Sequence, residues 1–280
     1  MPRRPEIAAR ELGQESTNVF LGSIEPHALM LNQPDDDQLI YKVMTVENLL
    51  RSIQGSYLHF NRVDSYSDFS GADPNDGEQL PTDRSGNSTT KFEKAPHFSA
   101  SDYYDQSRAR TYAACFSMEN SDSIWKTYGK RGEHGNVCVA FEFAKLRAML
   151  NDTLKSKRLS LLYRDVRCYD VFSINYGVVE YVDWAQHQAN SPHSPNPLTY
   201  TYLKDANFAA EKELRISLSA LGMGQFVIGD GIAIEFPSSL TMAFDFHRAY
   251  TVGAIRKILS APGREVNFLD DALLKLVIQS

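Results

Sequence analysis

The sequence predicts one α+β domain with a mixed or antiparallel central sheet and flanking helices. Apolar runs of strand length and amphipathic stretches of helix length follow one another along residues 38–280. We find no internal repeat and no clear linker in that part of the chain. Hydrophobic residues make up 42% of the 280 residues and charged residues 23%, near the averages for a globular chain. This composition excludes a mostly disordered protein, a collagen-like rod and a coiled coil.

The N-terminal part predicts an extension followed by a strand, a helix and a second strand. Residues 1–37 are polar and are expected to lie outside the domain as an extension. Residues 39–44 predict the first strand. Thr45 is expected to cap the following helix, and Gly55 is expected to end it. A second strand is expected over residues 57–61.

Residues 64–110 predict a long insertion. They are poor in apolar residues and rich in turn-forming residues, as in the Asp73–Gly77 segment. A long excursion from a compact domain is usually either functional or disordered. Two interpretations therefore stay open for this insertion: a loop on the substrate side of a site, and an inert addition.

Strands and helices follow the insertion. Strands are expected at residues 111–117, 136–143, 171–174, 177–182, 213–218, 226–228, 232–236 and 255–259. Helices are expected at residues 122–130, 144–155, 198–210 and 268–278. Residues 190–197 contain three prolines and predict a loop.

Charge and hydropathy exclude several function classes. The chain has 29 basic and 35 acidic residues, a net charge of −6, which argues against a broad basic surface for duplex nucleic acid. No apolar run approaches the roughly 20 residues that span a bilayer, and no apolar segment follows the arginines near the start. We therefore expect a cytoplasmic protein without a membrane partner.

Cysteine and histidine spacing predicts no metal site. Cys115, Cys138 and Cys168 form no C-x-x-C pair, and the seven histidines show neither H-x-H nor H-x-x-x-H spacing. Cys115 and Cys138 lie in apolar runs of strand character. We expect buried, reduced thiols.

Glu211, Glu213 and Arg215 alternate along the chain. In a strand, this spacing places all three side chains on one face. Two carboxylates and a guanidinium are costly to bury unpaired, so the face is either a solvated surface with salt bridges or a polar cleft. In a cleft, one ionised carboxylate would stabilise a developing positive charge, and its neighbour would bind or deprotonate an acceptor.

Trp125 and Tyr128 share one side of the helix expected at residues 122–130. Either Trp125 is a core anchor, or the two rings form an aromatic wall for a planar ligand, with the Tyr128 hydroxyl as a hydrogen-bonding group. The glycine-rich basic turn at residues 129–135 is either a plain flexible turn or a backbone approach to a phosphate. Lys42, at the end of the first strand, is by itself an ordinary lysine whose stem lies along apolar surface.

These motifs resemble a bacterial family, the domain of unknown function catalogued under number 2971. The first hallmark, Y-H-Y-T-S before a helix, is matched in part by the Tyr41–Thr45 segment. A central motif combines Cys115–Ser117, the Asp122–Gly129 segment with Trp125 and Tyr128, and a glycine that opens a strand ending at Phe141. The second hallmark is K-x-x-x-F-x-x-E-x-E-x-R, matched by Lys204, Phe208, Glu211, Glu213 and Arg215. The resemblance spans about residues 39–262.

The order of these parts also resembles the ADP-ribosyltransferase superfamily. That resemblance implies an NAD-dependent ADP-ribosyltransferase or NAD glycohydrolase, with NAD as substrate and a protein or nucleic acid as acceptor. It further implies a toxin or anti-phage effector, with an antitoxin or regulator as a partner. The implied sugar-stabilising residue is Glu213, and the implied acceptor residue is Glu211.

The resemblance also implies residues that bind NAD. Lys42 would contact the adenosine ribose or a phosphate, and Arg215 would pair with a glutamate or a pyrophosphate oxygen. Ser117 would buttress the catalytic glutamate or the nicotinamide end, and Trp125 or Tyr128 would line the nicotinamide pocket.

Two alternatives stay open beside this interpretation. The first is a nuclease or other hydrolase that uses Glu211 and Glu213, with or without a divalent metal. The second is a non-catalytic sensor or partner-binding module, in which residues 64–110 form the recognition surface.

Overall fold

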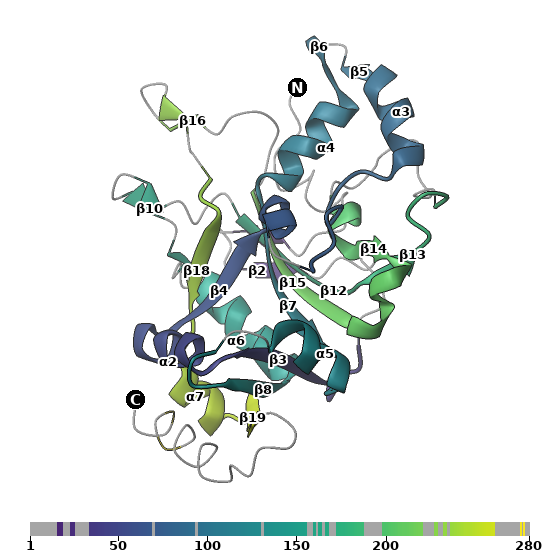
Figure 1. Ribbon diagram of the computed structural model, residues 1–280. Coiled ribbons are helices and arrows are strands. Elements are labelled where there is room, and N and C mark those ends of the chain that lie inside the picture. Colours follow the sequence, from purple (N-terminus) through teal and green to yellow (C-terminus); the bar gives the residue numbers. More distant parts are fainter. Residues whose placement is uncertain are drawn as a thin grey trace.

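An antiparallel sheet forms the centre of the computed structural model (Figure 1). Its nine strands are β3 (Leu39–Thr45), β4 (Tyr57–Arg62), β7 (Thr111–Ser117), β8 (Asn136–Glu142), β9 (Leu159–Ser160), β12 (Phe172–Val178), β15 (Glu213–Ala220), β18 (Ser239–Ala243) and β19 (Ile255–Ser260). The order is β19-β8-β3-β7-β4-β18-β9, and β15 joins β7 to β12. All of these pairings are antiparallel. The predicted α+β class with an antiparallel sheet and flanking helices is confirmed.

The structure describes residues 34–68, 71–92, 95–129, 132–155, 172–187, 198–220 and 236–260, with short pieces at 16–18, 23–25, 159–160, 162–163, 166–167, 227–228, 232–233, 275 and 277. The helices are α2 (Val46–Gly55), α3 (Pro81–Thr89), α4 (Ala100–Arg108), α5 (Asp122–Tyr128), α6 (Phe143–Lys155) and α7 (Phe246–Thr251). Short 3-10 helices are η1 (Val63–Asp68), η3 (Thr199–Tyr202) and η4 (Ala206–Glu211).

Small two-stranded sheets complete the described residues. They are β1 (Ser16–Asn18) with β2 (Ser23–Glu25), β5 (Lys91–Phe92) with β6 (Ala95–Ser99), β10 (Leu162–Tyr163) with β11 (Val166–Arg167), β13 (Glu180–Val182) with β14 (Leu203–Asp205), and β16 (Val227–Ile228) with β17 (Ile232–Ala233). Only β13 and β14 run parallel within this group. Within the described residues no helix has both the length and the apolar character to cross a bilayer.

The β3-α2-β4 unit forms close to where the sequence predicts it. Thr45 caps α2, since its hydroxyl accepts a hydrogen bond from the Asn48 amide at 3.2 Å. The helix ends one residue later than expected: the left-handed residue is Ser56 (φ 50°), not Gly55. Glycine stands at position 55 for another reason, because a Cβ there would lie 2.5 Å from the ring of Tyr57.

Strand β7 lies between β15 on one edge and two diverging strands on the other. It pairs with β15 along its whole length, from Glu213↔Ser117 to Ser219↔Thr111. On the opposite edge it meets β3 at Tyr41↔Ser117 and β4 at Asn61↔Ala113. Strands β3 and β4 therefore part beside the middle of β7, next to Cys115.

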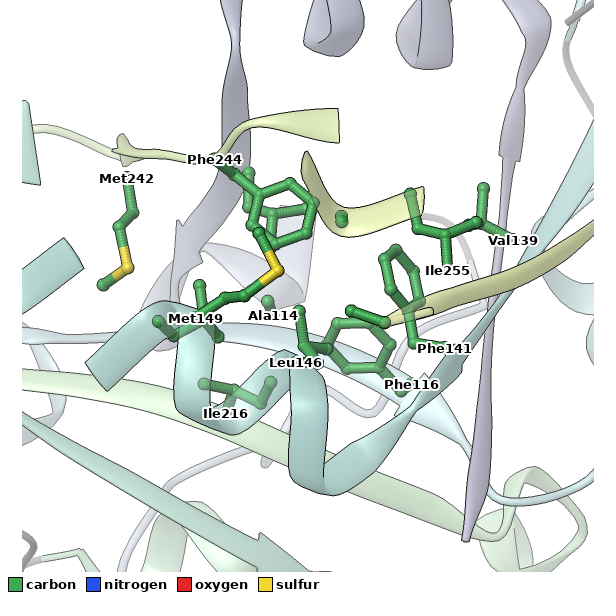
Figure 2. Close-up of a cluster of buried hydrophobic side chains, with 14 of the residues drawn as sticks. Ala114, Phe116, Val139, Phe141, Leu146, Met149, Ile216, Met242, Phe244 and Ile255 are labelled. Atoms are coloured by element: carbon green, nitrogen blue, oxygen red, sulfur yellow. The ribbon is translucent and has the colours of Figure 1, made fainter. Parts of the chain in front are cut away.

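One face of this sheet is apolar. Alternate residues of β15 and β7, such as Ile216 and Phe116, join the main core, where α6 contributes Leu146 and Met149 (Figure 2). The rings of Phe116 and Phe141 pack edge to face, with centroids 5.8 Å apart. The main core thus fixes β7 and β15 against α6.

The other face of β15 is polar and nevertheless buried, because a second layer covers it. That layer comes from the insertion and from residues 180–187 and 198–211, which share an apolar cluster that includes Leu80, Tyr104, Trp184 and Tyr200. The rings of Tyr104 and Tyr200 meet edge to face at 5.2 Å. In Figure 1 the helices α3 and α4 lie at the opposite end of the view from α2 and α7.

Several predicted elements differ from the structure. The helix expected over residues 198–210 is wrong: η3, β14 and η4 replace it. Leu203–Asp205 is extended because β14 pairs with β13 there, a tertiary contact that overrides local helix propensity. The strands expected at 171–174 and 177–182 are arranged as β12 and β13. Helices α3, α4 and α7 and strand β18 were not expected.

Other predictions fall outside the described residues. They concern most of the 1–37 extension, Cys168, the loop at 190–197, and the helix at 268–278 apart from Lys275 and Val277. Cys115 and Cys138 are free thiols, as expected, and Cys138 is buried. Burial raises the pKa of both thiols to about 12.

Candidate active site

A cluster of buried charges lies on the polar face of β15. Strand alternation turns Glu213 and Arg215 away from the apolar core, and both are buried, at 3% and 0% exposure. Their neighbours across the ladder are Ser117 and Cys115 of β7. Of the two arrangements that the sequence allowed, the solvated surface is excluded and a buried polar interior is found.

Arg215 uses every guanidinium N–H in hydrogen bonds. Its Nη1 and Nη2 donate to Oδ1 and Oδ2 of Asp76 at 2.5 and 2.7 Å. Its Nε and Nη2 donate to Oε1 and Oε2 of Glu213 at 2.9 and 3.0 Å, and Nη1 also donates to the carbonyl of Thr201 at 2.7 Å. Five bonds match the five donors of a guanidinium, so its plane is fixed between two carboxylates.

Lys204 joins a third carboxylate to the cluster. Its ammonium, on β14, donates to Glu211 Oε2 at 2.6 Å and Glu213 Oε2 at 3.2 Å, and lies 3.9 Å from Asp76 Oδ2. Glu211 is the last residue of η4 and does not belong to β15. It reaches the cluster because Lys212 adopts a left-handed conformation, φ 44°. The prediction that strand alternation alone aligns all three residues is therefore wrong for Glu211, although the three do meet.

The two glutamates are in opposite electrostatic states. Burial by itself would raise the pKa of Glu213, but Arg215 and Lys204 outweigh it and hold that pKa well below the usual range. Burial raises the pKa of Glu211, and Lys204 opposes this only in part. The ionised form of Glu213 is therefore favoured, whereas Glu211 is easier to protonate than an ordinary glutamate.

Two tyrosines border the carboxylates. The Tyr181 hydroxyl accepts a hydrogen bond from the Glu213 amide at 2.8 Å. The Tyr128 side chain is 45% exposed, while its hydroxyl interacts with Glu211. Desolvation of that hydroxyl, followed by the charges of Glu213 and Glu211, raises the pKa of Tyr128. Tyr128 thus connects the buried carboxylates with the molecular surface.

Ser117 contacts the cluster from β7, and Lys42 lies near it on β3, in the middle of that strand and not at its end as the sequence predicts. The Ser117 hydroxyl lies 2.7 Å from the carbonyl oxygen of Glu211, so it supports the turn that carries this glutamate. The Lys42 ammonium donates to the Cys115 carbonyl at 3.0 Å, where β3 and β4 part, and lies over the Phe116 ring. Burial lowers the pKa of Lys42, while Cys115 and Glu213 oppose that effect.

Trp125 is placed differently from the other predicted site residues. Its indole is 9% exposed and packs with Ile124 and Cys138, and its Nε1 donates to Asn120 Oδ1 at 2.7 Å. The ring is a core anchor, one of the two readings that the sequence left open. Tyr128 is the exposed aromatic ring at the end of α5.

Sequence reasoning missed three members of this site. Asp76 lies in a segment that the sequence predicts only as a turn. Lys204 matches a motif position to which no role was assigned, and Tyr181 lies in a predicted strand without a functional assignment. Spacing in the K-x-x-x-F-x-x-E-x-E-x-R motif was the available signal for Lys204, which also lies over the Phe208 ring. For Asp76 no local signal exists, since its partner is 139 positions away.

The turn at 129–135 packs against the start of α2. Its His134 amide donates to Glu47 Oε1 at 2.8 Å, and the Gly135 carbonyl accepts from the Val46 amide. This use of the amides favours a structural turn over a phosphate loop; Lys130 and Arg131 lie outside the described residues. In the part of the chain that the structure describes, no three His, Cys, Asp or Glu side chains are grouped as metal ligands.

Comparison with known proteins supports the family resemblance in part. Residues 124–216 match the model of a family described as "Protein of unknown function (DUF2971)". The match runs from α5 to β15 and includes Tyr128, Lys204, Glu211, Glu213 and Arg215. It covers about a third of the chain and leaves out Lys42, Asp76 and Ser117. No curated protein and no solved structure matches the chain.

Proposed function

We propose that this protein cleaves NAD, as an ADP-ribosyltransferase that modifies a protein or nucleic acid, or as a related NAD glycohydrolase. The proposal rests on two neighbouring buried carboxylates with unlike partners: Glu213 is paired with both Arg215 and Lys204, whereas Glu211 is paired with Lys204 and lies beside Tyr128. Neighbouring carboxyl groups whose pKa values are driven apart divide naturally into a fixed anion and an acid–base group. Cleavage of a glycosidic bond followed by transfer uses one of each.

Glu213 suits the stabilisation of a cationic sugar. When nicotinamide leaves NAD, its ribose C1 acquires the oxocarbenium character that glycosidases also meet. A carboxylate that is ionised, buried and fixed in position stabilises this charge more strongly than one in water. Glu213 has these three properties, through its contacts with Arg215 and Lys204.

To stabilise the sugar, Glu213 must present a carboxylate oxygen to the ribose, but both of its oxygens are paired with cations in this structure. The contact of Lys204 with Glu213 Oε2, at 3.2 Å, is the longest hydrogen bond that either cation makes in the cluster. Lys204 keeps its shorter bond to Glu211 if this contact opens. We expect the ribose to take that position, while Arg215 keeps Glu213 ionised.

Glu211 and Tyr128 suit the acceptor side. A carboxylate with a raised pKa accepts a proton readily, so Glu211 can remove one from an acceptor hydroxyl, amine or water as that group attacks C1. The exposed ring of Tyr128 supplies a flat surface for nicotinamide or for an acceptor base.

Lys42 suits the anionic half of NAD. Its contacts are with a carbonyl and an aromatic ring, and the described residues place no carboxylate within ion-pair distance of it. A diphosphate would supply the missing negative charge. An enzyme that consumes NAD or modifies a macromolecule in this way would serve as a toxin or anti-phage effector under a regulator.

The test is nicotinamide release from labelled NAD, with transfer measured to added protein, RNA and DNA. We expect release by the native protein and a fall of roughly 10²–10³-fold in kcat for Glu213→Gln. Glu180→Gln is the matched control, because Glu180 is exposed on the neighbouring strand β13, and should retain native activity. Circular dichroism verifies folding, and Glu213→Asp, which keeps the charge, should retain more activity than Glu213→Gln.

A second candidate is a non-catalytic partner-binding module. It is favoured by the closure of the cluster, since each carboxylate is already paired with Arg215 or Lys204 beneath the second layer. This candidate expects no nicotinamide release from the native protein. Equal release from native protein and Glu213→Gln would also reject the enzyme.

A further inference from the structure

The insertion takes part in the charge cluster through one residue, Asp76. This side chain is 3% exposed and binds Arg215 from a position 139 residues earlier in the chain. It also lies 3.9 Å from the Lys204 ammonium. The sequence left open whether residues 64–110 are inert or belong to a site. The contact between Asp76 and Arg215 supports the second interpretation.

The turn around Asp76 is built to hold it in place. The Asp73 carboxylate accepts from the Asn75 amide at 2.9 Å, and Arg108 Nε donates to the Asp76 carbonyl at 2.8 Å. Gly77 adopts φ +71°, a conformation that L side chains rarely adopt. Backbone contacts on both sides thus fix Asp76, and its carboxylate is left to Arg215.

Asp76 fixes the orientation of the guanidinium. It occupies Nη1 and Nη2, so the Nε–Nη2 edge of Arg215 must face Glu213. A planar guanidinium that is hydrogen-bonded along two edges cannot rotate without breaking two hydrogen bonds. The position of the Glu213 carboxylate therefore depends on Asp76, although no contact joins the two side chains directly.

Asp76 also adds negative charge to the cluster. The carboxylates of Asp76, Glu211 and Glu213 face the two cations Lys204 and Arg215, and the charge of Lys42 also acts on Glu213. Without Asp76 the same cations face one carboxylate fewer. A cationic sugar beside Glu213 would then lose part of its electrostatic stabilisation.

We propose that Asp76 is a positioning residue of the NAD-cleaving site, which makes the insertion part of that site; this inference rests on the function proposed above. Asp76 acts through Arg215, and it holds Glu213 in place and adds negative charge beside it. Asp76 should stabilise the transition state, in which the sugar is cationic, more than it strengthens the binding of NAD.

Steady-state nicotinamide release by Asp76→Asn tests the proposal. We expect kcat to fall about 10²-fold while KM for NAD stays within about threefold, and partial rescue by Asp76→Glu. Asp105→Asn is the matched control: Asp105 lies on α4 in the same insertion and pairs with Arg84, but not with Arg215 or with the Asp73–Gly77 turn. Its kcat should stay within about threefold of native. Equal losses in both variants, or a change in KM alone, would overturn the proposal.

A denaturation cycle tests the same link without activity. The midpoints of urea unfolding are measured for native protein, Asp76→Asn, Glu213→Gln and the double variant. Because both carboxylates share Arg215, we expect the double variant to lose clearly less than the sum of the single losses. Additive losses would overturn the positioning role. If the native protein releases no nicotinamide, the proposed enzyme is rejected, and this cycle alone decides whether Asp76 controls Glu213.

Discussion

At the scale of single residues, Glu213 is defined by the cations around it. Arg215 and Lys204 keep its pKa below the usual value, so the folded protein favours the ionised form more than the unfolded chain does. The resulting stability is present above the unfolded pKa of about 4.3. It is lost as pH falls from there toward the folded pKa.

The ion pairs of Glu213 should make the stability of the protein depend on pH in the acid range. We expect the contribution of Glu213 to the free energy of unfolding to fall as the pH decreases from about 5 to 3. Glu213→Gln should be less stable at pH 7, by about 3–5 kcal/mol, because it leaves buried cations without a partner. It should also show a weaker pH dependence over that range. Urea unfolding at stepped pH measures both, and equal pH slopes for native protein and variant would count against the ion-pair account.

The residue types of the site were readable from the sequence, but their surroundings were not. Glu211, Glu213 and Arg215 could be singled out because alternate charges in an apolar strand are unusual. Their burial followed from a covering layer that the sequence described only as turn-rich. For Trp125 the spacing left two readings, and packing against Cys138 decides which applies.

At the scale of elements, local signals predicted those with clear periodicity. Strands β3, β7, β8 and β15 and helices α2 and α6 lie close to their predicted bounds. Helix α4 begins with a capping box, Ser99 and Asp102, that could have been read from the sequence. The segment from η3 to η4 could not, because its extended part depends on pairing between β14 and β13.

The turn that ends at Gly77 depends on the absence of a side chain at this glycine. Gly77→Ala should destabilise the fold by about 1–3 kcal/mol, because it combines a positive φ with a Cβ placed 2.4 Å from Val63 Cγ1. Gly71→Ala is the matched control, since Gly71 also has a positive φ but open space around it. Gly71→Ala should lower the free energy of unfolding by less than Gly77→Ala does. Urea unfolding compares the two, and equal costs would show that the contact with Val63 is unimportant.

At the scale of the whole molecule, the site is assembled from distant segments. Strand β15 supplies Glu213 and Arg215, β14 supplies Lys204, the insertion supplies Asp76, and β3 brings Lys42 to the point where it parts from β4. Such convergence depends on sheet order and on the covering layer, so no sequence window contains it. The family match at 124–216 accordingly includes only part of the site.

In the proposed reaction the ribose of NAD binds against the ionised Glu213. A crystal structure with an NAD analogue whose ribose oxygen is replaced by methylene tests this placement. We predict the nicotinamide ribose within about 3.5 Å of the Glu213 carboxylate, with Lys204 withdrawn to Glu211 and the diphosphate near Lys42. An analogue bound elsewhere, with Glu213 still closed in by Lys204 and Arg215, would contradict the account.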